Sequence, residues 1–225
     1  MSLRKFIRDM QKRREAIPTP GAIFYNAIPA KLLKEAGKKI AQDVADRIED
    51  GTLIDLGSGT GYLSIEIARR APRLKVYGID LSEKMVEIAR KHAEGIANVR
   101  FEIGNVAELP FEDNSIDFII STGTLHHLKR PAKVFDECYR VLKAGKAAWI
   151  YDGCPGVPKE EAARLIREYG FLRYRILTKL QEFHGFTSEE YGSEIKTILD
   201  QTKFKDSYQM ERVDIWMKIT AMKYT

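Results

Sequence analysis

A glycine-rich run at residues 57–61 carries the strongest chemical signal in the sequence. Glycine has no side chain, so such a run allows a tight strand-to-helix turn and lets a ligand approach the backbone N–H groups at the helix start. Tyr62 stands where the dinucleotide fingerprint G-x-G-x-x-G needs its third glycine. Asp55, two residues before the run, would repel a pyrophosphate and suits a ligand with positive charge. The pattern therefore disfavours NAD and favours a cationic ligand.

Two adjacent histidines, His126 and His127, follow a short apolar segment at residues 116–121. An imidazole titrates near neutral pH, so either histidine could act as a general base. The alternative is that one histidine faces the ligand while the other packs or forms a structural hydrogen bond. No third residue has metal-ligand spacing with this pair, so we expect no metal site.

Short apolar segments alternate with amphipathic ones in the region that must position these residues. The pattern predicts strands over residues 53–56, 75–80, 99–103, 116–121 and 147–151, with helices between them, one of them capped by Ser82. Such alternation builds right-handed βαβ crossovers and a doubly wound parallel sheet of the α/β class. These sheets bind ligands at the carboxyl ends of their strands, and the glycine run and the histidines both follow a strand directly.

Helical segments precede this region. Residues 1–50 read as three helical stretches, broken at residues 17–21 and starting again near Ala22 and Lys38. We therefore expect a helical N-terminal cap segment, residues 1–50, and a ligand-binding domain, residues 51–225.

More helix is expected after the fifth strand, as an insertion at about residues 157–200. Residues 158–183 carry Leu172, Ile176 and Leu180 along one helix face, and Thr187 with Glu190 forms a capping box before a further helix. The C-terminus alternates over residues 204–210 and 213–222, with a tight turn at residues 211–212. This pattern predicts an antiparallel edge that completes a seven-stranded sheet.

Residues 53–61 (Leu-Ile-Asp-Leu-Gly-Ser-Gly-Thr-Gly), Asp80 and the turn at residues 104–106 resemble the class I S-adenosylmethionine (SAM) dependent methyltransferases. The resemblance is to the small-molecule branch that includes ubiquinone and menaquinone biosynthesis C-methyltransferases. It is dense over residues 53–152, moderate over 187–222 and weak before 50. It implies a Rossmann-like fold, S-adenosyl-L-methionine as cofactor, and in-line transfer of a methyl group to a small molecule.

The resemblance also implies a role for each cofactor-binding residue. Asp55 and the glycine run would hold the methionine part, and Asp80 would accept hydrogen bonds from both ribose hydroxyls. Asn105 and a neighbouring backbone N–H would read the adenine edge, while a main-chain carbonyl around residues 121–123 would contact the amino group. The predicted cofactor contacts are Asp55, Gly57, Ser58, Gly59, Gly61, Asp80, Leu81, Met85, Asn105, Val106, Ser121, Thr122 and Gly123.

Two positions depart from the family pattern. Asn105 stands where the family usually has aspartate, but its carbonyl oxygen can still accept from the adenine amine. Residues 144–146 read Ala-Gly-Lys where the family often has Pro-Gly-Gly, a change that affects only a turn.

Tyr25 lies in the N-terminal helices, which fold over the active site in this family. An aromatic ring there could contact the sulfonium by a cation–π interaction, or it could simply be buried. Tyr25 joins His126 and His127 as the candidate catalytic residues.

Composition and charge exclude several classes of protein. The chain has 225 residues, 44% of them hydrophobic and 31% charged, and no apolar run is long enough to span a bilayer, so we expect a soluble globular protein. The first twenty residues carry +4 of the total charge of +5, and the body therefore lacks the basic face typical of nucleic-acid enzymes. Cys138 and Cys154 cannot form a disulfide framework, and with no secretory signal we expect a cytoplasmic setting.

Two motif absences also count against a nucleic-acid base as the methyl acceptor. Residues 121–124 read Ser-Thr-Gly-Thr where N-amino methyltransferases of nucleic acids commonly carry Asn/Asp-Pro-Pro-aromatic, and Cys154 follows the wrong strand for a cytosine-C5 nucleophile. The alternatives to a small-molecule enzyme are an RNA or protein methyltransferase that uses the basic N-terminal helix, and a non-catalytic SAM-binding scaffold. That helix could also contact an anionic membrane surface.

Overall fold

The structure is a computed structural model that describes residues 29–224, and within them the side chains of all but residues 29–35, 183 and 184. The expected helices before residue 29 and the candidate Tyr25 lie outside the described residues. No helix among the described residues is long and apolar enough to cross a membrane.

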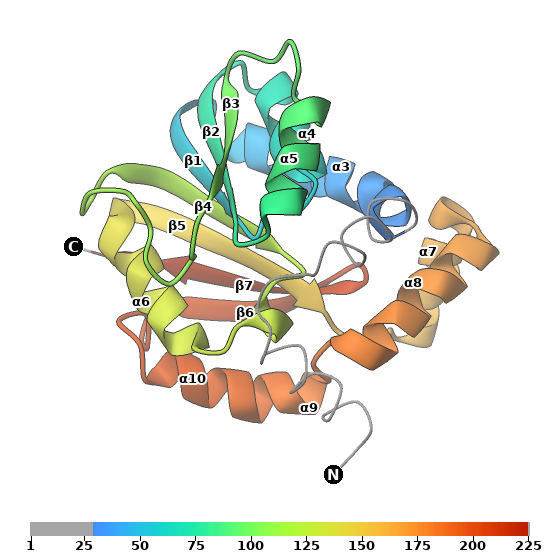
Figure 1. Cartoon of the computed structure of the whole chain (residues 1–225). Coiled ribbons are helices and arrows are strands. Elements are labelled where there is room, and N and C mark those ends of the chain that lie inside the picture. The colour runs from blue at the N-terminus through green and yellow to red at the C-terminus, as the bar shows by residue number, and fades with distance from the viewer. Residues whose placement is uncertain (1–28, 225) are drawn as a thin grey trace.

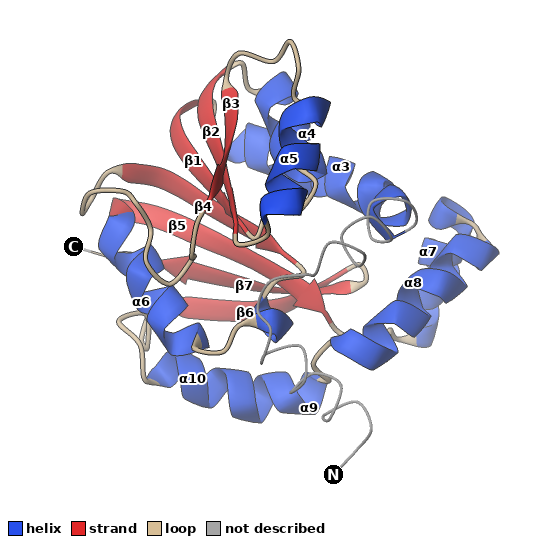
Figure 2. Ribbon diagram, viewed as in Figure 1, coloured by secondary structure: helices blue, strands red, loops and turns tan. Residues whose placement is uncertain are grey.

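A seven-stranded sheet forms the centre of the molecule (Figures 1 and 2). The strand order is β3-β2-β1-β4-β5-β7-β6. Five strands are parallel: β1 (Asp50–Leu56), β2 (Arg73–Asp80), β3 (Val99–Ile103), β4 (Ile116–Thr122) and β5 (Leu142–Gly153). The last two form an antiparallel edge: β6 (Tyr208–Val213) and β7 (Trp216–Met222). The expected doubly wound sheet with an antiparallel C-terminal edge is confirmed.

Helices cover both faces of the sheet (Figure 2). One buried core contains residues of α3 (Pro29–Arg47), α4 (Tyr62–Arg70), α5 (Glu83–His92), α7 (Lys159–Tyr169) and α8 (Phe171–His184). The other contains residues of η1 (Leu125–His127), α6 (Pro131–Val141), η2 (Tyr191–Ile195) and α10 (Lys196–Asp200), with the single turn α9 (Ser188–Glu190) before η2. Because side chains alternate along a strand, Leu53 of β1 joins the first core and Ile54 joins the second.

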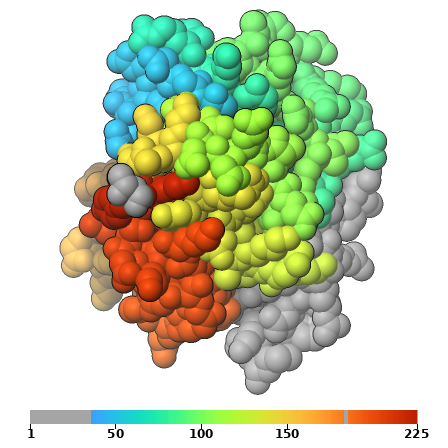
Figure 3. Space-filling model, turned by 90° about the vertical axis from the view of Figure 1, so that its left-hand side faces the viewer, coloured from blue at the N-terminus to red at the C-terminus, as the bar shows by residue number. Residues whose placement is uncertain are grey.

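Two helix starts that were predicted from capping residues are confirmed. Ser82 caps α5 by accepting from the Met85 backbone N–H, and Thr187 and Glu190 form the expected capping box. Figure 3 shows the C-terminal elements, orange to red, side by side with the yellow α6 on one face of the molecule.

Several sequence-based boundaries are wrong, including the start of the strand predicted over residues 204–210, which begins at Tyr208. No new helix starts near Lys38, because α3 runs through Gly37 while Ala36, Ile40 and Val44 form one continuous buried stripe. A glycine inside a helix costs only about 1 kcal/mol relative to alanine, which such burial offsets. Strand β5 likewise begins at Leu142 rather than after Gly145, whose N–H donates to the Lys223 carbonyl.

The predicted turn at residues 211–212 lies inside β6, and the chain reverses at Asp214 instead. Asp214 has a positive φ of 52°, which aspartate tolerates better than most residues. Its carboxylate accepts from Lys39 of α3 at 3.2 Å and from Arg164 of α7. These two tertiary contacts, which no local pattern reveals, fix where the hairpin turns.

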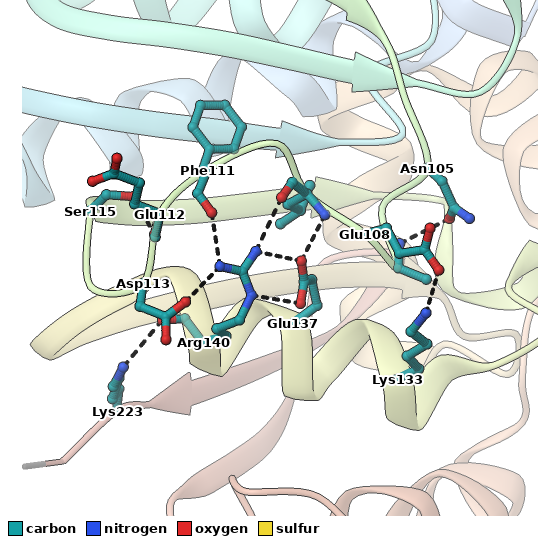
Figure 4. A network of polar contacts seen from close by, with 12 residues as sticks. Asn105, Glu108, Phe111, Glu112, Asp113, Ser115, Lys133, Glu137, Arg140 and Lys223 are labelled. Carbon is teal, nitrogen blue, oxygen red and sulfur yellow. Dashed lines mark hydrogen bonds and ion pairs between the residues drawn. The ribbon is translucent and has the colours of Figure 1, made fainter.

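An ion network on α6 holds the long loop between β3 and β4 (Figure 4). Arg140 donates to the carbonyls of Phe111 and Leu109 at 2.8 and 3.1 Å, and to the carboxylates of Glu137 and Asp113 at 2.6 and 2.7 Å. Glu137 in turn accepts from the Leu109 backbone N–H at 2.7 Å. The network therefore anchors the same loop that begins with Asn105.

Candidate functional site

A cavity of about 370 Å³ opens at the carboxyl ends of β1, β2, β3 and β4. The strand order reverses between β1 and β4, which is the point where doubly wound sheets bind ligands. Its walls are the loops at residues 57–60, 80–81, 104–107 and 122–124, together with one turn of α3 around Lys38. Its volume lies within the range of small-molecule sites.

The glycine run packs too tightly to accept side chains at two positions. Gly57 has a φ of +68°, and a Cβ there would lie 2.2 Å from Oγ1 of Thr124. Gly61 has a φ of +81°, and its Cβ would lie 2.6 Å from the Phe101 ring. The N–H groups of Gly57 and Ser58 both donate to the Ile79 carbonyl, so the run is tied to the end of β2. The loop is a rigid wall of the cavity.

Asp55 lies behind this loop and does not line the cavity. Its carboxylate is 1% exposed and accepts a 2.5 Å hydrogen bond from the Ser64 hydroxyl of α4. Burial raises the pKa of Asp55 to about 7, with a further contribution from the charge of Asp80, although the Ser64 hydrogen bond acts in the opposite direction. Ser121 is also turned away, because its hydroxyl donates to the Leu56 carbonyl.

Asp80 projects into the cavity from the end of β2. Its two carboxylate oxygens accept from the N–H groups of Gly59 and Ser82, each at 2.8 Å. Burial raises the pKa of Asp80, and these two hydrogen bonds act against that shift. Each oxygen keeps a further lone pair, so the side chain can accept from two neighbouring hydroxyl groups.

An apolar strip adjoins this carboxylate. Leu81 lines the cavity and remains 41% exposed, while Met85 lies below it, 1% exposed. Val106 completes the strip from the next loop. An exposed leucine inside a cavity offers an apolar surface on which a flat ring can pack.

The Asn105 side chain lines the cavity and is partly used within its own loop. Its Oδ1 accepts from the Ala107 N–H at 2.9 Å. The Asn105 oxygen that we expect to accept from the adenine amine therefore already accepts one hydrogen bond. Its second lone pair remains for a ligand.

The two histidines take different positions. His127 lines the cavity, whereas His126 is 8% exposed and lies behind it. His126 contacts Asp152 at the end of β5: its Nδ1 is 2.8 Å from Oδ1, and its backbone N–H donates to Oδ2 at 2.9 Å. The centroids of the two imidazole rings are 4.0 Å apart.

Asp152 is a residue that the sequence interpretation missed. It is 1% exposed, and burial alone would raise its pKa, but the charge and hydrogen bonds of His126 outweigh burial and hold that pKa below its usual range. Its position directly after a predicted strand, at the sheet edge that carries the other candidates, was the available signal.

Several other cavity residues carry no motif. Tyr62 stacks on His92 with ring centroids 4.9 Å apart, and Nδ1 of His92 lies 2.9 Å from the Thr60 carbonyl oxygen. The remaining charged or aromatic lining residues are Lys38, Glu66, Arg69, Arg130 and Trp216. Within the described part of the chain, no group of three His, Cys, Asp or Glu side chains is placed to hold a metal ion.

Comparisons with known proteins agree on one family. Residues 49–205 match the model of a methyltransferase domain. Phosphoethanolamine N-methyltransferase of Triticum aestivum is 30% identical over 79% of this chain and 32% of that protein. Arsenite methyltransferase of Halobacterium salinarum is 34% identical over 45% of this chain and 27% of that protein. The chain thus spans about a third or less of the length of these two curated relatives.

A solved structure is similar over nearly the whole chain. It is a protein of Methanococcus maripaludis assigned as an S-adenosyl-L-methionine-dependent methyltransferase, with 28% identity and a TM-score of 0.73. The match covers 92% of this chain and 94% of that one.

Proposed function

The chain belongs to the methyltransferase domain family, and from this we propose that it transfers the methyl group of SAM to a small-molecule acceptor. The names of two relatives specify small acceptors, phosphoethanolamine and arsenite, which supports this choice. We further propose that residues 1–50 and about 157–200 cap the acceptor.

The observation that carries the proposal is the Asp80 carboxylate in the cavity, held by two backbone N–H groups beside the exposed Leu81. A carboxylate with spare lone pairs suits the two ribose hydroxyls, and the apolar strip suits the adenine ring. These groups fit an adenosine-containing ligand.

When bound, SAM supplies a methyl group activated by its sulfonium charge. The protein's part is to orient the acceptor in line with that group and to exclude water. Rigid loops suit this task, and the glycine run is tied to β2 while Thr124 packs against Gly57. We assign Thr122 and Gly123, which line the cavity, to the end of the site where the methyl group is presented.

His127 is our candidate for holding or accepting a proton of the acceptor, because it is the imidazole of this pair that lines the cavity. His126 and Asp152 act behind it as positioning residues. Asp152 binds both the backbone N–H and the ring of His126, and so fixes the turn that carries His127. An acceptor that already exposes an unprotonated nucleophile would need no such base.

We also propose that the enzyme works in the cytoplasm. Cys138 and Cys154 are both buried free thiols, a state that a reducing compartment maintains.

The first test is calorimetric titration with SAM and with S-adenosylhomocysteine. Replacing Asp80 with alanine removes hydrogen bonds to a charged group, so we expect roughly 10–100-fold weaker binding of both ligands. Asp206→Ala, which removes a highly exposed carboxylate, is the control and should bind as the wild type does. A folded wild-type protein that binds neither ligand would refute the proposed cofactor. Unchanged binding by the Asp80 variant would refute only its role.

A further inference from the structure

The outward face of α8 carries an apolar stripe that nothing in the described structure covers. Leu172 is 72% exposed and Ile176 is 36% exposed, with the half-buried Leu180 one turn further on. The buried face of the helix is a different one, formed by Leu177 and Gln181, which are 1% and 7% exposed. The stripe noted in the sequence is therefore not the face that α8 packs against the body.

A large exposed aromatic side chain lies beside this stripe, at the start of the helix. Phe171 is 64% exposed and follows Gly170, whose φ of 83° makes the corner between α7 and α8. In Figure 1 the two helices form a hairpin at the edge of the molecule, away from the sheet. Three of the largest exposed apolar side chains thus lie within two turns of one peripheral helix.

Cationic side chains flank the stripe. Successive residues of an α-helix are about 100° apart, so Arg175 and Lys179 fall on one side of Leu172 and Ile176, and Arg173 falls on the other. All three cations are exposed. The one acidic residue in the sequence of α8 is Glu182, which is paired with Lys179 at 2.7 Å.

The neighbouring helix has no such excess of exposed cations. Arg164 of α7 is paired with Glu168 at 3.0 Å and with Glu161 and Asp214, which directs its charge toward the body. The cations of α7, Lys159, Arg164 and Arg167, are matched in number by its three glutamates, so α8 has an excess of cations that α7 lacks.

We propose that this face of α8, namely Phe171, Leu172, Arg173, Arg175, Ile176 and Lys179, docks the protein on an anionic phospholipid bilayer. The apolar side chains would enter the boundary between headgroups and acyl chains, while the cations contact lipid phosphates. The positive charge of this face favours an anionic bilayer over a second copy of the chain as its partner. A second copy of the same face would bring like charges together, since α8 supplies one carboxylate and that one is already paired. The inference does not depend on the proposed methyl transfer.

Flotation of the full-length protein with vesicles tests the proposal. The protein should bind vesicles made of equal parts phosphatidylcholine and phosphatidylglycerol, should bind pure phosphatidylcholine far less, and should be released by salt. Two double variants test the apolar and the cationic contributions separately. Leu172→Ser with Ile176→Ser removes apolar side chains, and Arg173→Glu with Arg175→Glu reverses two positive charges. Each should reduce binding to the anionic vesicles at least about tenfold.

Matched controls use exposed residues far along the chain from α8. Ile103→Ser removes a side chain that is 52% exposed, and Arg100→Glu reverses an exposed cation; both should bind vesicles as the wild type does. All variants change exposed positions, so melting curves should stay close to the wild type.

Three outcomes would overturn the proposal. Full vesicle binding by both α8 variants would assign the membrane contact to another segment, such as the basic first twenty residues. Absence of vesicle binding by the wild type would exclude a bilayer partner. Light scattering that shows a dimer lost in the Leu172/Ile176 variant, without vesicle binding, would identify a second copy as the occupant.

Discussion

Two buried carboxylates of similar exposure have pKa values shifted in opposite directions because of their partners. Asp55 has one hydroxyl donor and the charge of Asp80 nearby, and burial raises its pKa to about 7. Asp152 has His126 and two backbone N–H groups, and its pKa is lowered. The hydrogen-bond and charge partners of each carboxylate, more than its depth, therefore decide the direction of its pKa shift.

The Asp55 shift predicts a stability effect with a definite sign. Its pKa is higher in the folded state than in the unfolded one, so the folded state binds more protons between about pH 4 and 7, and stability falls as pH rises through that window. Asp55→Asn removes this dependence. Between pH 5 and pH 8 the variant should gain about 2–3 kcal/mol relative to the wild type. Urea unfolding without ligand at both pH values measures this, and a pH-independent difference would show that Asp55 is ionised in the folded protein.

The Asp152 shift predicts the opposite sign. Its folded pKa lies below the ordinary value of about 3.9, so its contribution is present above that pH and disappears as pH falls through the folded pKa. Asp152→Asn should cost about 1–3 kcal/mol near neutral pH and less in acid. Urea unfolding at pH 7 and pH 3 compares the two conditions. An equal cost at both would mean that the carboxylate's charge contributes nothing and that the loss reflects packing alone.

At the scale of elements, the Arg140 network connects α6 to the loop that carries Asn105 (Figure 4). Arg140→Ala removes several hydrogen bonds and leaves Glu137 without its hydrogen-bonded cation, so we expect a loss of about 1–3 kcal/mol of stability. Binding of S-adenosylhomocysteine should weaken as well, because the loop is less well held. Thermal unfolding and calorimetry measure the two effects.

Arg73→Ala is the matched control for that substitution. Arg73 pairs with Glu49 at 2.6 Å, but both side chains are more than half exposed, and such surface pairs contribute about 0–1 kcal/mol. If both arginine variants lose the same stability, the Arg140 network is an ordinary surface ion pair and the loop is held by other contacts.

The predictable and unpredictable elements differ in the range of their contacts. Strand alternation, the Ser82 cap and the capping box at Thr187 are local, and the sequence located each of them. The turn at Asp214 depends on Lys39 and Arg164, respectively 175 and 50 residues away in the chain. The partnership of Asp152 with His126 spans 26 residues. Side chains that meet only after the sheet forms leave no periodic signal in the sequence. The contact between His126 and Asp152 was therefore not predictable.

At the scale of the whole molecule, the proposed site lies at one end of the parallel strands. Strand β7 of the antiparallel edge reaches it only through its first residue, Trp216, while no described residue of β6 or α8 lines the cavity. Glycine spacing, Asp80 and the histidines were visible in the sequence because each lies at or shortly after the end of a strand. Lys38, Arg69 and Trp216 reach the same cavity from α3, α4 and β7, and only the packing of these elements brings them there.

This geometry predicts where ligand binding should protect the backbone. Hydrogen exchange with S-adenosylhomocysteine should slow in residues 57–64, 80–86, 104–107 and 122–128, which surround the cavity. Residues 171–180 of α8 and 208–213 of β6, which do not line the cavity, should exchange as they do without ligand. A free ligand concentration of about 100 times Kd should add about 2.7 kcal/mol and raise Tm by about 5–10 °C. Asp80→Ala should reduce both effects at the same concentration. Protection concentrated on α8 instead would place the ligand outside the strand ends and would contradict the proposed site.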